Sequence, residues 1–352
     1  MRLKLMALAA VAIAAATAFG VSAATSGTQS LTNPKHFFWA KGQPNPNGTV
    51  SSTANDLVYH GGNAGSGAIG VEKKPAVYLV YWGTEWANGF TTPDTNGTLY
   101  SSKTLQNYVN SFFGGVGGSA WAGVQTQYCR DVPAGTTSCK GIKGADYIAN
   151  PTRQLKGVWT DATPVPSDIV TLGLAENLVD DPIAMEAQRA AAHFGYDKNA
   201  TYIILTPPRT IGTGQPVYCG YHSQTSSVDG LGNPYRLQYA FIPWLNENWP
   251  GVGTTGCGMH FVNATSDAFG NGIFDGYSIV TGHEYAEAVT DPDNIASWQD
   301  GWLDAQGSEN GDKCAWAANT QNITLGSHQF AVQPLWSNEA FDSTGNGCVV
   351  AR

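Results

Sequence analysis

The sequence predicts an α/β fold, built as a single domain with a mixed central sheet and disulfide-tied loops. Runs of β-branched and aromatic residues, such as residues 76–82, alternate with segments of helical periodicity, such as residues 182–194. The cysteines are even in number, as expected where disulfides tie loops together. Because no internal repeat and no linker follows residue 70, one domain is the simplest arrangement.

The first residues carry the features of an export signal. Arg2 and Lys4 precede an apolar run over residues 5–21, and small residues follow it. This order is typical of a signal peptide, which we place at residues 1–23. The run is short for a membrane span, and no later segment approaches about 20 apolar residues. The mature chain is therefore expected to be secreted, extracellular or periplasmic, with no membrane segment.

Residues 24–70 differ in composition from the rest of the chain. They are rich in Ser, Thr, Asn and Gly and show little helical or strand periodicity. We expect a low-complexity N-terminal arm, resembling a propeptide, before a folded domain over residues 71–352. Regular structure should begin at Ala76, with strands in the β-rich runs at residues 76–82, 201–205 and 237–242.

Two helices are predicted between these strands. The segment 105–113 has helical periodicity and should end at Gly114-Gly115. The segment 182–194 follows an aspartate pair, has Pro in its first turn and should end at Gly195.

Charge and missing motifs narrow the classes of function. The formal net charge is -9, so an acidic surface is expected, which argues against nucleic acid or an anionic membrane as a partner. The chain has no nucleotide-binding loop, no dinucleotide glycine fingerprint and no Gly-x-Ser-x-Gly elbow in a fitting context. Metal-assisted hydrolysis remains as an enzyme class. The sequence does not set an oligomeric state.

The six cysteines indicate disulfides rather than a thiolate metal site, because the chain has no Cys-x-x-Cys pair and begins with an export signal. Sequence alone leaves the connectivity open. We expect nearest-neighbour pairing, which joins Cys129 to Cys139, Cys219 to Cys257, and Cys314 to Cys348.

The segment His283-Glu284-Tyr285-Ala286-Glu287 carries the clearest chemical signal. It lies in an apolar run that predicts a helix, with Asp275 as its cap and an end at Thr290-Asp291-Pro292. Positions four apart differ by about 40° around a helix, so His283 and Glu287 could bind one metal ion. Glu284 stands about 100° from His283, the place of a general base that acts on water.

Further ligands are needed, because His283 and Glu287 leave a zinc ion short of protein donors. Glu309 is our first candidate and Asp312 is either a second ligand or a partner of His283. Asp291 lies on the same helical face, but it serves equally well as a plain helix end. Glu287 stands where the usual zinc motif has His, so calcium competes with zinc as the metal.

Two other histidines and several tryptophans have both a functional and a structural interpretation. His222 and His260 each lie near a cysteine, and pairing of those cysteines would draw the two histidines together. Either could then reach the site as a donor, or both could have structural roles near the disulfide. Five tryptophans could form a cleft for peptide or sugar, or simply pack in the core: Trp244, Trp249, Trp298, Trp302 and Trp336.

Several stretches together resemble the secreted EXORDIUM or phosphate-induced protein family, in its bacterial branch: residues 77–83, 218–222 and 239–244, Asp275-Gly276, Thr290-Asp291-Pro292 and the late cysteines. The likeness covers roughly residues 75–350. It implies an extracellular role, since plant members are cell-wall proteins linked to growth, but it implies no chemistry. The His283 helix is similar to the zincin-like active-site helix of metallopeptidases and departs from it at Glu287.

The leading hypothesis is a secreted zinc metallopeptidase acting on peptide or protein substrates. In it, His283, Glu287 and Glu309 bind Zn²⁺ and Glu284 is the catalytic base. The alternative is a non-catalytic extracellular or cell-surface binding protein with a structural Ca²⁺ and a cell-wall glycan as partner. A third possibility is a metal-free protein in which His283 and Glu287 form a buried pair.

Overall fold

A six-stranded mixed sheet positions the residues of interest. The computed structural model describes residues 35–43, 56–62, 68–175, 180–228, 234–249, 251–292 and 300–352, all within the unit Leu31–Arg352. Within these ranges the strand order is β1-β10-β11-β9-β3-β8. In that order the strands span His36–Trp39, Tyr218–Val228, Pro234–Ile242, Ala200–Leu205, Ala76–Trp82 and Leu155–Asp161.

Seven α-helices and two 3-10 helices are found in the described ranges. They are α1 (Thr84–Asn88), α2 (Ser102–Val116), α3 (Ala120–Gly123), η1 (Val124–Gln127), α4 (Ile169–Gly173), α5 (Pro182–Phe194), α6 (Asp275–Thr290), η2 (Asp312–Cys314) and α7 (Asn338–Thr344). Short strand pairs complete this part of the chain: β2 (Val58–Gly61) with β12 (Gly301–Leu303), β4 (Thr91–Pro93) with β5 (Leu99–Ser101), β6 (Cys129–Arg130) with β7 (Asp146–Tyr147), β13 (Gln321–Leu325) with β14 (His328–Val332), and β15 (Leu335–Trp336) with β16 (Cys348–Val349).

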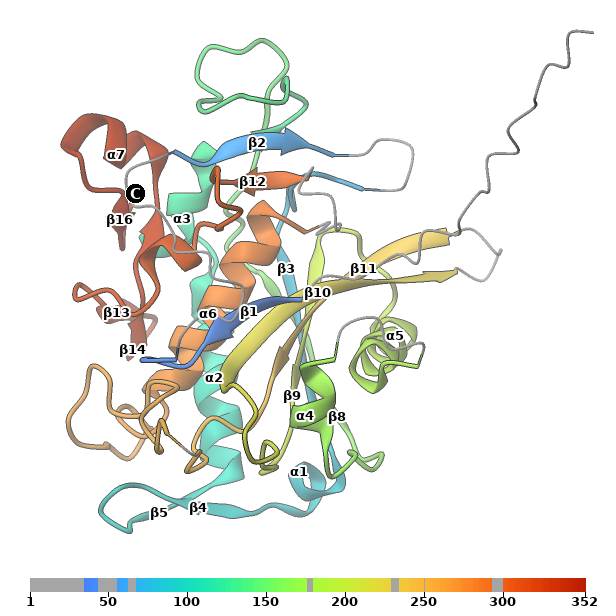
Figure 1. Cartoon of the computed structure of the whole chain (residues 1–352), viewed down its shortest axis with the longest axis vertical. Helices are drawn as coiled ribbons and strands as arrows, with labels where there is room; N and C mark the ends of the chain where they lie inside the picture. The colour runs from blue at the N-terminus through green and yellow to red at the C-terminus, as the bar shows by residue number, and fades with distance from the viewer. Residues whose placement is uncertain are drawn as a thin grey trace, which may run out of the picture. The chain divides into compact units, whose positions relative to one another are not determined.

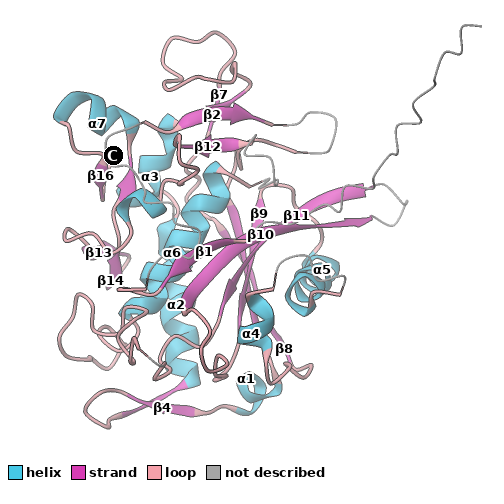
Figure 2. Cartoon of the chain, in the orientation of Figure 1, coloured by secondary structure: helices cyan, strands magenta, loops and turns pink. Residues whose placement is uncertain are grey.

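The sheet is parallel on one side and antiparallel on the other. β8, β3, β9 and β11 run parallel, whereas β10 and β1 pair in antiparallel fashion. Helices α6 and α2 lie on one face of the sheet, and α5 and α4 lie on the other (Figures 1 and 2). Cover on both faces explains why all six residues of β9 are buried. The predicted α/β class with a mixed sheet is confirmed.

The two predicted helices form, with one correction. α5 spans the expected residues, and Asp181 caps it by accepting the backbone N–H groups of Ile183 and Ala184. α2 does not end at Gly114-Gly115 but continues to Val116. Its buried face, which includes Val116, packs in the core, and this packing outweighs the low helical propensity of two glycines.

The N-terminal part of the chain holds regular structure that was not expected. β1 and β2 both precede Ala76, so the expectation that regular structure begins there is wrong. β1 pairs with β10, and the ring of Phe37 packs against Tyr218 and Tyr221, with ring centroids 5.2 Å apart in both pairs. The predicted signal peptide lies outside the described residues.

All three predicted disulfides form, between Cys129 and Cys139, Cys219 and Cys257, and Cys314 and Cys348. The second joins β10 to the loop before α6, and the third joins η2 to β16. Such disulfides are typical of extracellular proteins. In the part of the chain that the structure describes, no helix has the length and apolar character to cross a membrane.

Helix α6 is buried along its whole length, so polar residues on it are candidates for a structural or functional role. All of its residues from Asp275 to Thr290 are buried. Asp275 was expected to cap the helix. Instead it is the first helical residue, and its carboxylate accepts the backbone N–H groups of Val262, Asn263 and Gly272. It therefore fixes the preceding loop against the helix.

Two helical glycines allow a direct test of this packing. Gly114 in α2 is exposed, and a Cβ there would meet nothing within 4 Å, so Gly114→Ala should raise the free energy of unfolding by about 1 kcal/mol. A Cβ at Gly276 in α6 would lie 2.1 Å from the backbone oxygen of Cys257. Gly276→Ala should therefore lower the free energy of unfolding by about 1 to 3 kcal/mol. Chemical denaturation measures both, and a stabilised Gly276→Ala would contradict the close approach.

Candidate metal centre

Four separate segments bring histidines and carboxylates together. Helix α6 contributes three of them, and strands β10 and β1 contribute one histidine each. The turn before and at the start of η2 contributes two carboxylates. The resulting set is His283, Glu284 and Glu287 from α6, His222 from β10, His36 from β1, and Glu309 and Asp312 from the turn.

These side chains form three overlapping triads, in each of which the candidate ligand atoms lie within 4.8 Å of one another. The triads are His36, His222 and Glu309; His222, Glu284 and Glu287; and His283, Glu287 and Asp312. The structure therefore contains buried groups of His and acidic residues that could hold a metal ion.

The carboxylate of Glu287 lies between two histidines. Its Oε1 is 3.0 Å from Nε2 of His283, and its Oε2 is 3.6 Å from Nε2 of His222. The backbone N–H of Asp312 also donates to Oε1, at 2.9 Å. This carboxylate therefore links the histidine of α6 to the histidine of β10.

Hydrogen bonding fixes the tautomer of His283. The side-chain amide of Gln333 donates from Nε2 to the backbone oxygen of Gly311 at 2.9 Å, which turns its Oε1 toward His283. That oxygen lies 3.3 Å from Nδ1 of His283 and can only accept, so Nδ1 carries the proton. The lone pair of the ring is then on Nε2.

Oxygens that are also acceptors lie close to this lone pair, and none of them is hydrogen-bonded to Nε2. Nε2 of His283 lies 3.0 Å from Oε1 of Glu287 and 3.8 Å from Oδ1 of Asp312, and among the described residues it has no hydrogen-bond donor. Acceptors brought together in a buried site repel one another unless a cation or a proton lies between them. An imidazole whose other nitrogen is held in this way could serve as a metal ligand.

The space around these atoms is tight. The backbone of Gly311 passes so close that a Cβ there would lie 2.8 Å from both Oε1 of Glu287 and Nδ1 of His283. The ring of Phe38 stacks on His283 at 3.8 Å between centroids, with 9° between the planes. The imidazole is thus held on one face by Phe38 and at its Nδ1 edge by Gln333.

Glu284, the predicted base, is buried. Neither of its oxygens has a hydrogen bond of normal geometry with a described residue. A Cβ at Gly220 on β10 would lie 2.7 Å from Oε1 of Glu284, so only glycine leaves room for this carboxylate. Burial, with the negative charges of Glu309 and Asp312, raises the pKa of Glu284 well above its ordinary value. Such a carboxyl holds a proton more readily than an exposed one.

The pKa shifts of three other residues of the cluster favour the neutral form in some and the charged form in others. Burial lowers the pKa of His283 to about 3, so its ring stays neutral. Burial alone would raise the pKa of Glu309, but the neighbouring His222 and His36 lower it well below the ordinary value. Burial and Glu309 raise the pKa of Asp312 to about 7, although one third of its side chain is exposed.

The predicted residues are placed as follows. Asp312 completes the triad of His283 and Glu287, while Glu309 contacts the histidines of the two strands, with its Oε2 3.0 Å from Nε2 of His222. Asp291 is the residue that ends α6.

The two histidines for which both a functional and a structural role were considered lie in different places. His222 joins the cluster, whereas Nδ1 of His260 lies 2.9 Å from the backbone oxygen of Asn263 in the loop before α6.

Sequence reasoning missed His36 as a site residue. It lies opposite His222 in the β1–β10 pairing, and its Nδ1 makes a short contact with Glu309. The only available signal was the run His36-Phe37-Phe38-Trp39, which is aromatic within an otherwise polar segment.

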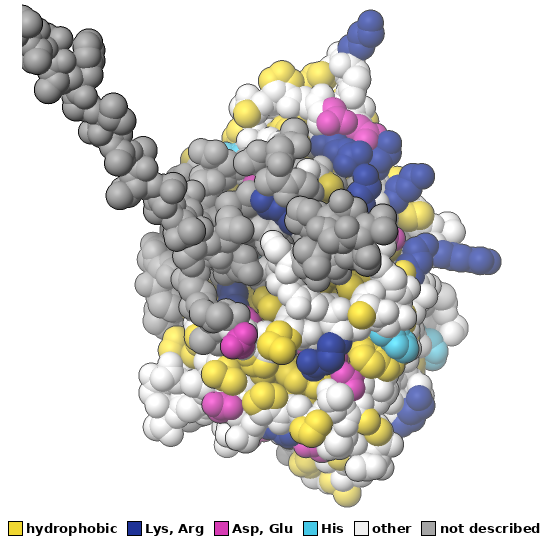
Figure 3. Space-filling model, turned by 90° about the vertical axis from the view of Figure 1, so that its right-hand side faces the viewer, with side chains coloured by type: hydrophobic (Ala, Val, Ile, Leu, Met, Phe, Trp, Pro, Cys, Tyr) yellow, Lys and Arg dark blue, Asp and Glu magenta, His cyan; other side chains and the backbone are white. Residues whose placement is uncertain are grey.

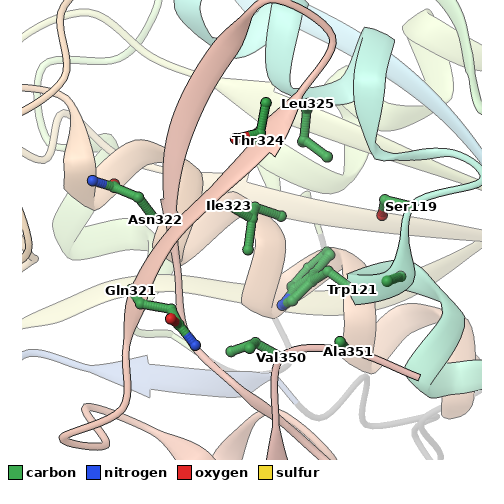
Figure 4. A pocket seen from close by; sticks show the side chains of 10 residues that line it. Ser119, Trp121, Gln321, Asn322, Ile323, Thr324, Leu325, Val350 and Ala351 are labelled. Atoms are coloured by element: carbon green, nitrogen blue, oxygen red, sulfur yellow. The ribbon is translucent and has the colours of Figure 1, made fainter.

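Most of the tryptophans belong to the core. Four of the five candidates are buried, namely Trp244, Trp249, Trp302 and Trp336, so a cleft lined by these four is excluded. Trp298 lies outside the described residues. The pocket in Figure 4, of about 240 Å³, is lined by side chains such as Trp121, Ile323 and Val350. None of its lining residues is acidic or a histidine, so it is not part of the cluster.

Much of the negative charge lies inside the protein. The buried acidic residues are Glu72, Asp94, Asp161, Glu186, Asp275, Glu284, Glu287, Asp291, Asp300, Asp304 and Glu309. Some face a cation: Asp161 and Glu186 pair with Arg189. In contrast, the described ion pairs of Glu287 and Glu309 are with histidines. On the face in Figure 3, Lys and Arg side chains (dark blue) are prominent and acidic side chains (magenta) are few.

Comparison with known proteins identifies no relative of this chain. Neither the protein-family models nor the curated sequences nor the solved structures give a match to this chain. The chemistry of the cluster must therefore be argued from its own atoms.

The hydrogen bond between Nδ1 of His283 and Gln333, which fixes the tautomer, gives a testable prediction. Gln333→Leu removes the acceptor at Nδ1 of His283, so zinc affinity should fall by about 10- to 100-fold. Titration against a competing chelator measures this. The matched control is Gln125→Leu, which removes a buried amide that donates to the backbone oxygen of Ala286 on the same helix and should leave zinc affinity unchanged. Equal affinities for wild type and Gln333→Leu would contradict the role of Gln333 in orienting His283.

Proposed function

We propose that this chain is a secreted, metal-dependent hydrolase, a zinc metallopeptidase that cleaves peptide or protein substrates. The single observation that carries the proposal is that buried Nε2 of His283 lies close to carboxylate oxygens of Glu287 and Asp312 and has no hydrogen-bond partner among the described residues. The export signal and the three disulfides support secretion. The resemblance to the EXORDIUM family agrees with an extracellular site of action and supplies no chemistry.

The donor set favours zinc over calcium. Calcium takes six to eight oxygen ligands, whereas zinc binds imidazole nitrogen together with carboxylate oxygen. Each of the three triads contains at least one imidazole. We assign His283, Glu287 and Asp312 as the protein ligands, with Glu309 and His222 adjacent to Glu287. Bound zinc would lower the pKa of a water and polarise a substrate carbonyl.

In the proposed reaction, Glu284 is the base. One of its oxygens lies within 4.8 Å of an oxygen of Glu287, so it can reach a water held beside the ligands. Glu284 accepts a proton from that water while the water oxygen bonds to the carbonyl carbon of the substrate. The C–N bond then breaks, and the proton passes from Glu284 to the leaving amine. Water is consumed and no redox change occurs.

A second candidate function is favoured by one observation. His283, Glu284, Glu287 and Glu309 are at most 1% exposed, and structural metal sites are closed in this way. The alternative is thus a non-catalytic extracellular binding protein with a structural ion. In that case metal removal should lower the melting temperature without any hydrolysis in the presence of metal.

Glu284→Gln separates the two functions. For the enzyme, the wild-type chain contains zinc and hydrolyses casein slowly, whereas Glu284→Gln keeps the zinc and loses about 100-fold or more in rate. Elemental analysis and a labelled-casein assay measure both quantities. Glu339→Gln, on an exposed helix, is the control and should match wild type. A metal-free wild type, or equal rates in wild type and Glu284→Gln, would refute the proposed enzyme.

A further inference from the structure

We infer that the edge of β10 is the binding surface for an extended polypeptide substrate, and that strand β1 of this chain occupies this surface and blocks it. This inference rests on the proposed function, because it names the substrate class and the control of the same site. The occupant is the strand His36–Trp39.

β1 binds as an added peptide strand would. It lies at the end of the sheet order and pairs in antiparallel fashion with β10, with His36 opposite His222 and Phe38 opposite Gly220. Without β1, the strands β10, β11, β9, β3 and β8 still form a continuous sheet whose free edge is β10. Extended peptides add to such edges through main-chain hydrogen bonds, and alternate side chains give specificity.

The alternate side chains of β1 separate into two groups. His36 and Phe38 point to the site: His36 contacts Glu309, and the ring of Phe38 stacks on His283. Phe37 points to the opposite face, where it packs against Tyr218 and Tyr221. This alternation is that of a β-strand. Two residues of β1 therefore lie where substrate side chains would meet the proposed ligands.

β1 also closes the site. The carboxylate of Glu284 is fully buried, and Phe38, itself 1% exposed, lies between His283 and Trp316, with its ring centroid 4.7 Å from that of Trp316. Among the described cluster residues on α6 and in the turn, only Asp312 has an appreciable exposed fraction. A polypeptide substrate cannot reach Glu284 while the strand is in place.

The strand is held firmly at both ends. Nζ of Lys35 donates to the backbone oxygen of Ala175 at 2.7 Å and pairs with Asp181 at 3.0 Å. At the other end, the backbone N–H of Lys41 donates to the oxygen of Gly256 at 2.8 Å. Opening therefore requires local unfolding or cleavage of the chain, and the intact protein is a latent form.

Two phenylalanines of the same strand provide a matched test in the full chain. Phe38→Ala removes the ring over His283, so casein hydrolysis should rise at least 10-fold and zinc should transfer to EDTA at least 10-fold faster. Phe37→Ala removes an equal ring that helps to hold the strand from the other face but covers no proposed ligand, so both rates should rise less than threefold. His36→Ala, at the more exposed end of the strand, should keep its zinc and also raise hydrolysis. The rise should vanish when Glu284→Gln is added to Phe38→Ala.

The possible outcomes distinguish failure of the proposed function from failure of the blocking strand. If no variant contains zinc and none cleaves casein, the proposed function fails. If zinc is present and wild type, Phe37→Ala and Phe38→Ala all cleave at one rate, the enzyme stands and the blocking strand is refuted. An equal rise in Phe37→Ala and Phe38→Ala refutes the assignment of Phe38 as the cover. Loss of zinc in His36→Ala also overturns the inference, since His36 would then be a permanent ligand.

A peptide competition tests the binding surface without relying on one variant. The probe is a synthetic peptide with the sequence of residues 35–41, added to the His36→Ala or Phe38→Ala protein. It should inhibit casein hydrolysis, and a peptide with Ala at the positions of His36 and Phe38 should be at least 10-fold weaker. Equal inhibition by both peptides, or none by either, contradicts recognition at the β10 edge.

Discussion

One hydrogen-bond relay determines what the centre of this protein can do: Gly311 holds Gln333, and Gln333 holds Nδ1 of His283. Because the amide orientation places the proton on Nδ1, the lone pair is on Nε2, which lies 3.0 Å from Oε1 of Glu287 inside the core with no hydrogen bond between them. Burial makes that arrangement costly unless a cation or a proton is shared. The proposed metal site depends on this single orientation.

The rest of the fold keeps the relay in place. α6 is buried on all sides, so His283 and Glu287 have fixed rotamers and little access to water. The disulfide from Cys314 holds the turn that carries Asp312, and the disulfide from Cys219 holds β10 close to His222. Close packing at Gly220 and Gly311 leaves room for carboxylates and for nothing larger. A site on such rigid elements is preorganised, which also means that a moving part must provide access.

Sequence reasoning found the elements whose signals are local. The buried strand over residues 76–82, the capped helix over 182–194 and the cysteine pairs follow from β-branched runs, cap residues and chain spacing. The spacing of His283 and Glu287 is likewise local, since both lie on one helix. His36 could not be found in this way, because its place beside Glu309 depends on strand pairing with β10, which lies far along the chain. β8 was missed because its apolar signal is weak: it is a sheet edge with exposed positions and a glycine.

The central claim is that His283, Glu287 and Asp312 share a divalent cation. Crystals of the full chain, with diffraction collected above and below the zinc absorption edge, test this most directly. The account predicts an anomalous peak beside Nε2 of His283 that also contacts the carboxylates of Glu287 and Asp312. A map without such a peak in zinc-supplemented crystals, with Glu287 hydrogen-bonded directly to Nε2, would contradict it.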